Sequence, residues 1–289
     1  MVHFHARLRS RGKLERHPAD APYGPNARNI PAEKDTRCGD ARQGSYLGPE
    51  FSDRDIRRTL EKYGAQSKYC EDFSNLASDV SVLLAEGNVV GWFQGRMEFG
   101  PGALGGRSIL GDARNPEMQK KLNLKIKCRE GFRPFAPSVL EEDIGECFEL
   151  DRKSPYMLLV APVREDRQIP LPERYHEQSL YDRLYFLRSD LPSITHVDYS
   201  ARIQSVSRRT NPRYWELIHE FKKLTNYGVI VNTSFNVRGE PIVCTPEDAY
   251  RCFMRTETDF LVVGNHVLSK KEQPALAETG DWLREFKLD

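Results

Sequence analysis

Short apolar runs alternate with capped helical segments from Ser52 to Leu268, and this alternation limits the possible folds more than any other feature. The predicted strands are 89–93, 108–110, 156–160, 196–204, 229–231 and a hairpin formed by 260–263 and 266–268. The predicted helices are 53–63, 74–86, 116–124, 212–224 and 246–255. Strands interleaved with helices favour an α/β (α+β) fold, in which helices cover a mixed sheet.

Individual residues support these assignments. Ser52 precedes the first helix as an N-cap, and Thr245-Pro246 begins the last one. Polar and apolar side chains alternate from His196 to Gln204, which predicts a strand with one polar face. Residues 156–160 are apolar throughout and predict a buried strand, whereas 164–191 are charged, contain proline and are interpreted as a loop or insertion.

The two ends of the chain differ from this middle part. Residues 1–50 contain five Pro and five Gly with almost no apolar periodicity, so we predict a disordered head over 1–45. The folded domain is predicted to be 46–270, followed by a polar tail over 271–289 with a helix around Trp282. No apolar run approaches the roughly 18 residues of a membrane span, and none resembles a secretory signal. The six cysteines form no C-x-x-C pair, and this pattern is typical of proteins whose thiols stay reduced. We therefore expect a cytoplasmic protein without a membrane partner.

The charge balance excludes one class of function. Among the 289 residues, 43 Lys and Arg face 42 Asp and Glu, for a net charge of +1. A globally basic nucleic-acid binder is therefore not expected. An anionic ligand would need a local cluster of cations.

Three short segments place polar groups two residues apart: Lys127-Cys128-Arg129, Arg202-Ile203-Gln204 and Ser234-Phe235-Asn236. In an extended backbone the outer two side chains of each segment share a face. Ser234 and Asn236 follow a predicted strand, and ligands of open α/β sheets gather at the carboxyl ends of strands. These cations could clamp a phosphate or carboxylate. The alternative is that the basic run 120–133 is only a solvated surface.

A second candidate is the loop 95–106, which contains five glycines and has Arg96 near its start and Arg107 directly after its end. Glycine lets a backbone approach a ligand closely, but the loop matches no phosphate-binding motif and a tight structural connection is equally consistent with it. His3 and His5 lack further spaced ligands, so they do not predict a metal site. No pattern indicates a protein nucleophile.

Five segments together resemble the C-terminal domain of NodU/CmcH-type O-carbamoyltransferases. They are YLGPEFSDRDI (46–56), FQGRMEFGPGALGGRSIL (93–110), KCREGFRPFAPSVL (127–140), ARIQSV (201–206) and VNTSFNVRGEPIVCTP (231–246). The similarity covers about 46–268 and keeps the order of the family's segments.

This resemblance implies a YrdC-like open twisted sheet with a concave basic face. The domain would bind ATP, Mg²⁺ held mainly by the phosphates, and carbamoyl phosphate, and would form carbamoyl-adenylate. Lys127, Arg129, Ser234 and Asn236 resemble the adenylate-binding K-x-R and S-x-N pairs, and Arg202 resembles a phosphate-contacting arginine. Arg96, Arg107 and Arg133 are second-tier candidates, since any of them could brace the loop instead. No catalytic side chain is assigned.

Two departures leave a second hypothesis open. The family loop usually reads PRALG, whereas Gly102 replaces its arginine here. The family's larger N-terminal domain, which binds iron through histidines and transfers the carbamoyl group, is not expected in this chain, so a separate domain is the expected partner and no protein-bound transition metal is expected. The first hypothesis is a carbamoyl-adenylate-forming half. The second is a non-catalytic remnant that keeps a nucleotide- or RNA-binding cleft.

Overall fold

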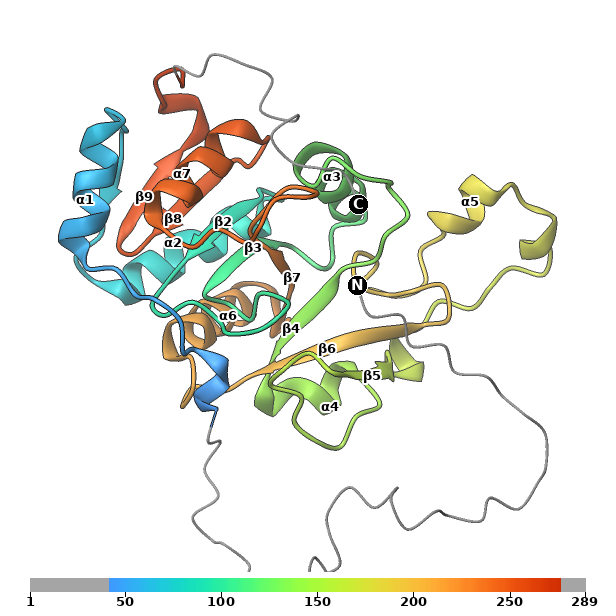
Figure 1. Ribbon diagram of the computed structural model, residues 1–289. Helices are drawn as coiled ribbons and strands as arrows, with labels where there is room; N and C mark the ends of the chain where they lie inside the picture. The colour runs from blue at the N-terminus through green and yellow to red at the C-terminus, as the bar shows by residue number, and fades with distance from the viewer. Residues whose placement is uncertain (1–41, 277–289) are drawn as a thin grey trace, which may run out of the picture. The chain divides into compact units, whose positions relative to one another are not determined.

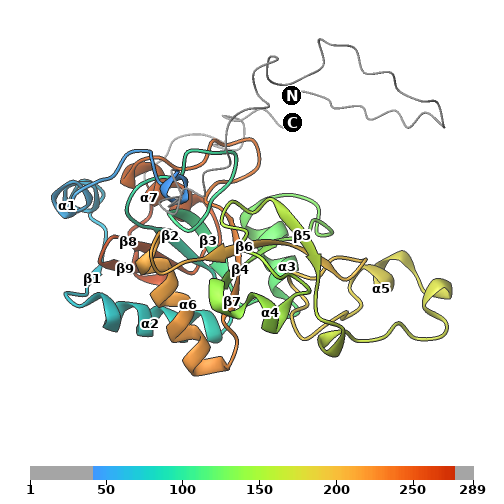
Figure 2. The same cartoon turned by 90° about the horizontal axis from the view of Figure 1, so that it is seen from below.

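The computed structural model describes residues 42–276, which lie within one compact unit. Nine strands in this part of the chain form a sheet in the order β1-β9-β8-β2-β3-β7-β4-β6-β5 (Figure 1; β1 is labelled in Figure 2). The strands are β1 (Lys68–Tyr69), β2 (Val90–Phe93), β3 (Arg107–Gly111), β4 (Ala136–Leu140), β5 (Leu159–Pro162), β6 (Ser200–Val206), β7 (Val229–Ser234), β8 (Phe260–Val263) and β9 (His266–Ser269). The helices are α1 (Asp53–Lys62), α2 (Phe73–Ala85), α3 (Met118–Lys121), α4 (Ile144–Cys147), α5 (Leu180–Leu184), α6 (Pro212–Thr225) and α7 (Pro246–Arg255).

The sheet is mixed. β2 pairs in parallel with β8, and β4 pairs in parallel with β6, while the other neighbouring strands are antiparallel. Two buried clusters show that helices cover both faces. α2 and α6 pack on one face, and α1, α3 and α7 contribute to the cluster on the other (Figure 2). The prediction of an open mixed α/β sheet covered by helices is confirmed.

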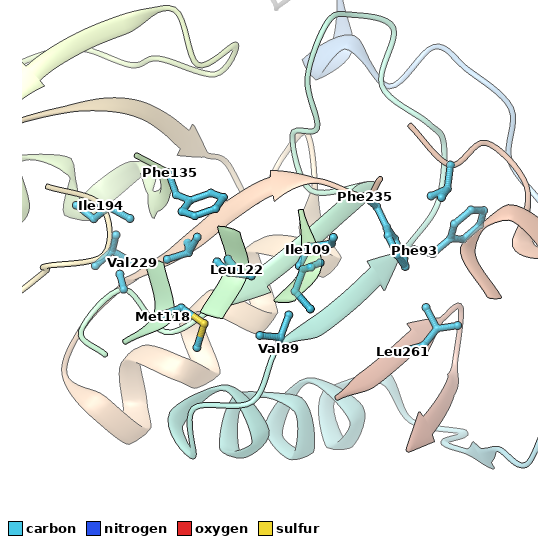
Figure 3. Close-up of a cluster of buried hydrophobic side chains, with 14 of the residues drawn as sticks. Val89, Phe93, Ile109, Met118, Leu122, Phe135, Ile194, Val229, Phe235 and Leu261 are labelled. Atoms are coloured by element: carbon cyan, nitrogen blue, oxygen red, sulfur yellow. The ribbon is translucent and has the colours of Figure 1, made fainter. Parts of the chain in front are cut away.

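The core explains which strand residues are apolar. Val89, Ile109 and Leu261 point to the α7 side, where Met118 and Leu122 join them (Figure 3). Residues on the opposite face of the same strands, such as Trp92 and Leu110, pack against α2 and α6. Because both faces are covered, the central strands are almost continuously apolar, as the sequence indicated.

Most predicted element ends are confirmed by their caps. Ser52 and Asp55 form a capping box at the start of α1, and Thr245 and Asp248 form another at α7. The hairpin of β8 and β9 turns at Gly264, whose φ of 57° suits glycine. The predicted helix 116–124 begins later, at Met118, and continues as a π-helical turn over Leu122–Ile126.

Three predictions about strands and faces are wrong. β6 begins at Ser200 rather than His196, because 196–199 form a turn in which Tyr199 has a φ of 63°. The strand predicted over 156–160 lies at Leu159–Pro162 (β5), and it is an edge strand in which only Ala161 is buried and Val160 is 60% exposed. The sequence pattern predicts Trp215, Ile218, Phe221 and Leu224 on the inner face of α6. Leu224 is instead exposed, whereas Tyr214 and Leu217 are buried.

The predicted head and tail fall mainly outside the described residues, as does the helix expected around Trp282. Residues 43–45 form a 3₁₀ turn, and the insertion 164–191 contains two further 3₁₀ turns and α5. Within 42–276, no helix combines the length and apolar character needed to cross a bilayer.

Candidate anion-binding site

A cavity of about 390 Å³ lies where β7 ends, and it brings together three of the predicted site residues, Arg129, Arg202 and Ser234. We call it the Arg202 cavity. Its lining consists of Arg42, Ser45, Phe99–Leu104, Arg129, Pro134, Phe135, Ala136, Tyr156, Met157, Leu158, Arg202, Asn232, Thr233 and Ser234. Its volume is within the range of roughly 300–1,000 Å³ that is common for ligand pockets.

Sheet topology explains why these distant segments meet. β4 lies between β7 and β6, and Ala136 at the start of β4 pairs with Asn232 near the end of β7. β6 runs parallel to β4, so Arg202 lies near the same end of the sheet. Ser108 in β3 pairs with Ser234, which places the preceding glycine-rich loop over this end.

The cavity is electropositive. Arg42, Arg129 and Arg202 line it, and none of its lining residues in the described part of the chain is acidic. The Nε atom of Arg129 donates to Asn123 Oδ1 at 2.7 Å, and its guanidinium lies 5.1 Å from the Phe135 ring centroid. Burial, followed by the nearby positive charge of Arg133, lowers the pKa of Arg129 from its usual value. An incoming anion would therefore meet the guanidinium groups of Arg129 and Arg202, and no acidic side chain of the described lining neutralises their charge.

Lys127 lies behind the cavity rather than in it. Its side chain is 4% exposed, and Nζ donates to the carbonyl oxygen of Ser234 and, at 2.8 Å each, to the carbonyl and side-chain oxygens of Asn236. Burial lowers the pKa of Lys127 to about 7. Lys127 therefore fixes the turn after β7.

The extended backbone predicted for 127–129 is wrong. Lys127 ends the π-helical turn, and Cys128 has a φ of 49°, in the left-handed region. Lys127 and Arg129 consequently diverge, with Arg129 lining the cavity and Lys127 buried behind it. A tight turn rather than a strand therefore sends the two side chains to different surroundings.

Ser234 and Asn236 also have different surroundings. Ser234 Oγ accepts a hydrogen bond from the Ala103 backbone N–H at 3.3 Å, which joins the end of β7 to the loop. Asn236 accepts from Lys127 and donates through Nδ2 to the Glu240 carbonyl at 2.7 Å. Asn236 thus shapes the turn, while Ser234 lines the cavity.

Glu98 organises the glycine-rich loop. Its side chain is 6% exposed, and Oε1 accepts backbone N–H groups of Leu104 at 2.7 Å, Gly106 at 2.5 Å and Arg107 at 3.2 Å. The segment 99–104, which lines the Arg202 cavity, is thereby tied back to a buried carboxylate. No motif marked Glu98, since a single acid in a loop has no distinctive spacing.

The second-tier arginines lie elsewhere. Arg107 is fully buried and donates to the carbonyls of Gln94, Gly95, Gly106 and Pro49, and burial lowers its pKa to about 10. It braces the loop. Arg133 is exposed and pairs with Glu130 at 3.2 Å. Arg96 lines a different cavity.

A buried polar network supports the floor of the Arg202 cavity. Gln204 Oε1 accepts from Ser138 Oγ at 2.6 Å and from Asn232 Nδ2 at 2.8 Å, while Gln204 Nε2 donates to the Leu104 carbonyl at 2.7 Å. Asn232 Nδ2 also donates to the Ala103 carbonyl, and its Oδ1 is buried without a hydrogen-bond partner. Burying an acceptor without a donor lowers the stability of the fold, unless another group donates a hydrogen bond to it.

Sequence reasoning missed Arg42, Asn232 and Tyr156. Asn232 could have been found, because it lies two residues before Ser234 and hence on the same side of a strand. Arg42 fell within the predicted head, although its guanidinium lies 5.9 Å from the Tyr156 ring centroid. Within 42–276, no three His, Cys, Asp or Glu side chains gather in an arrangement that could hold a metal ion.

Comparison with known proteins identifies relatives of this domain. Residues 81–270 match the family described as Carbamoyltransferase C-terminus. The chain is 58% identical to the uncharacterized protein sll1178 of Synechocystis over 89% of the chain and 42% of that protein. It is 42% identical to the nodulation protein NolNO of Sinorhizobium fredii, covering 84% of the chain and 32% of NolNO.

A third relative is an enzyme whose name states its activity. The chain is 36% identical to the 3'-hydroxymethylcephem-O-carbamoyltransferase of Streptomyces clavuligerus, over 64% of the chain and 31% of that enzyme. Among solved structures, full-length HypF in its phosphate- and nucleotide-bound form aligns with a TM-score of 0.43 and 16% identity, covering 68% of this chain and 22% of HypF. The chain spans less than half the length of these proteins. By the match over 81–270, this chain belongs to the carbamoyltransferase family, in the part that forms the C-terminus of its members.

Proposed function

We propose that this chain binds ATP and carbamoyl phosphate in the Arg202 cavity and forms carbamoyl-adenylate, which a separate domain uses to carbamoylate a hydroxyl of a small molecule. Membership of a carbamoyltransferase family supports the carbamoyl chemistry. The observation that carries the proposal is the convergence of Arg129, Arg202 and Ser234 in one cavity without an acidic residue in its described lining.

The reaction needs such a cavity because it joins two anions. Carbamoyl phosphate is hydrolysed to carbamate and phosphate, and a carbamate oxygen attacks the α-phosphorus of ATP. The new P–O bond forms as the bond between the α-phosphorus and the bridging oxygen breaks, and pyrophosphate leaves with that oxygen. Fixed cations reduce the repulsion between the reactants and stabilise the leaving group, so the chemistry requires positioning and electrostatics rather than a protein nucleophile.

Each lining residue fits a part of this task. Arg129 and Arg202 would hold phosphate oxygens through their planar donor sets, which suit bidentate contacts. The Ser234 hydroxyl would hydrogen bond to the ligand, and Asn236 and Lys127 would keep Ser234 in place. Mg²⁺ would enter with the phosphates of ATP and neutralise part of their charge.

The direct test is carbamoyl-phosphate-dependent release of pyrophosphate from ATP. Wild type should release pyrophosphate, and Arg129→Ala, Arg202→Ala and Ser234→Ala should reduce the rate at least about tenfold, because each removes a contact with a charged group worth roughly 1.5–3 kcal/mol. Arg133→Ala is the matched control, since Arg133 is exposed and ion-paired outside the cavity. Equal rates in wild type and all three cavity variants would refute the proposal.

Gly102 favours the second candidate, a nucleotide- or RNA-binding cleft without catalysis. It occupies the cavity wall at the position where the family loop usually has arginine. Calorimetry with ATP and carbamoyl phosphate separates the two functions. Nucleotide binding without pyrophosphate release supports a binding cleft, and RNA binding with a steep salt dependence and no nucleotide affinity supports the RNA-binding form of it.

A further inference from the structure

A second cavity, of about 520 Å³, is lined by the start of the glycine-rich loop and also contains three arginines. We call it the Arg213 cavity. It is lined by Tyr46, Glu50, Gln94, Gly95, Arg96, Arg209, Thr210, Asn211, Pro212 and Arg213. The three guanidinium groups face one carboxylate, that of Glu50, whose Oε2 is 3.7 Å from Arg96 Nε. The lining therefore carries an excess of positive charge.

The position of Arg213 is fixed by neutral groups. One of its terminal nitrogens donates to Gln94 Oε1 at 2.8 Å and to Asn265 Oδ1 at 3.0 Å. The guanidinium also lies 4.5 Å from the Phe73 ring centroid. The side chain of Arg213 is half-buried, and no ion pair joins it to a described carboxylate, although the charges of Glu216 and Glu50 act on it from nearby.

The two amides that hold Arg213 are themselves oriented by the backbone. Gln94 Nε2 donates to the Gly264 carbonyl at 2.7 Å, and Asn265 Nδ2 donates to the Cys70 carbonyl at 3.0 Å. Their oxygens are thus directed at the guanidinium before any ligand arrives. A guanidinium held in this way loses little freedom on binding an anion, which favours affinity.

The Arg213 cavity is distinct from the Arg202 cavity. Gly95 and Arg96 line the former, 99–104 line the latter, and no described residue lines both. Tyr46 joins their walls, since its hydroxyl donates to the Leu104 carbonyl at 2.6 Å and accepts from Asn211 Nδ2 at 2.9 Å.

We propose that the Arg213 cavity is a second anion site, which binds a small phosphate-bearing ligand. Arg213 would provide the fixed cation, and Arg96 and Arg209 would provide contacts from the rim. A phosphate group fits this chemistry because its oxygens accept several guanidinium donors at once. The proposal concerns binding alone and stands whether or not the chain forms carbamoyl-adenylate.

The test measures the binding of inorganic pyrophosphate to the full chain by calorimetry. ATP and carbamoyl phosphate are left out. The double variant Arg129→Ala/Arg202→Ala removes guanidinium groups from the first cavity and should still bind pyrophosphate. Adding Arg209→Gln to this background should weaken that binding about tenfold or more, as should Arg96→Gln. Both side chains are exposed, so these variants do not endanger folding.

Two controls make the result specific. Arg208→Gln changes an exposed neighbour that lies over Trp215 and outside the cavity, and it should leave the affinity unchanged. Arg213→Gln should abolish binding at this site, with circular dichroism used to check that the variant is folded. Loss of all pyrophosphate binding in Arg129→Ala/Arg202→Ala, or unchanged affinity after Arg96→Gln and Arg209→Gln, would overturn the proposal.

Discussion

The carboxylate of Glu98 should determine whether the wall of the Arg202 cavity is ordered. Oε1 accepts three backbone N–H groups, from Leu104, Gly106 and Arg107, all in buried surroundings. In Glu98→Ala these donors lose their acceptor while the surrounding chain still excludes water. Each unsatisfied buried N–H costs about 1–3 kcal/mol, and because the three share one loop we expect a total loss of about 3–5 kcal/mol.

Glu98→Gln separates charge from shape. Glutamine keeps one oxygen that can accept hydrogen bonds but removes the negative charge, and hydrogen bonds to a charged group are roughly twice as strong as neutral ones. We therefore expect a smaller loss, of about 1–3 kcal/mol. The alanine variant should lose more stability than the glutamine variant, and both should lose more than Glu71→Ala, a control at an exposed glutamate.

Two measurements check this ranking. Urea unfolding gives the change in free energy, and hydrogen exchange reports the amides of Leu104 and Gly106 directly. Those amides should exchange faster in Glu98→Ala, since the loop can open without unfolding the sheet. If their exchange and the unfolding free energy both match wild type, the carboxylate does not hold the loop and this reasoning fails.

Three other predictions concern single residues near the same site. Gly102→Arg should increase carbamoyl-phosphate-dependent pyrophosphate release several-fold or more. A Cβ at Gly102 meets no atom within 4 Å, and the added cation would line the Arg202 cavity. An unchanged rate would show that glycine at this position does not limit activity. Gly105→Ala should lower the unfolding free energy by about 2 kcal/mol or more in urea titrations. The φ of Gly105 is 105°, and a Cβ there would overlap the Tyr214 ring. A variant as stable as wild type would show that this overlap does not matter. Burial lowers the pKa of Lys127 from 10.5 to about 7, so between these values the unfolded chain binds more protons. The unfolding free energy should therefore rise with pH by up to about 1.4 kcal/mol per unit across this window, and Lys127→Met should rise less steeply; parallel pH profiles would contradict the shift.

Local patterns predicted the elements whose ends are fixed by neighbouring residues. Ser52 and Thr245 cap helices within one turn, and Gly264 sits in the tight turn of a hairpin. These interactions involve residues close in sequence, so the sequence displays them. The mixed sheet followed from the interleaving of strands and helices.

Tertiary contacts decided the features that were missed or predicted wrongly. The polar and apolar alternation before Ser200 resembles a strand, yet Tyr199 adopts a left-handed conformation and its hydroxyl donates to the Ile169 carbonyl across the insertion. Residues 156–160 are apolar but lie toward the edge of the sheet, where no further strand covers them. Sequence hydrophobicity alone does not distinguish an edge from the centre.

The sequence predicted several of the residues that gather at the site, but not where each of their side chains lies. Arg202 and Ser234 lie at the cavity because they occupy a strand and a strand end, as expected. Lys127 differs because the turn at Cys128 directs it into the protein, where it holds Ser234 and Asn236. Whether a basic side chain meets the ligand or the backbone depends on that turn, and the sequence does not encode its direction in any simple pattern.

The strand order has a consequence for how the protein assembles during synthesis. β2 pairs with β8, where Val90 is opposite Phe260, and β3 pairs with β7, where Ser108 is opposite Ser234. The centre of the sheet therefore joins segments more than 120 residues apart, and such distant pairings slow folding. Until the ribosome has released β7 and β8, the nascent chain exposes β2 and β3 without these partner strands, and unpaired strand edges of this kind are prone to aggregation.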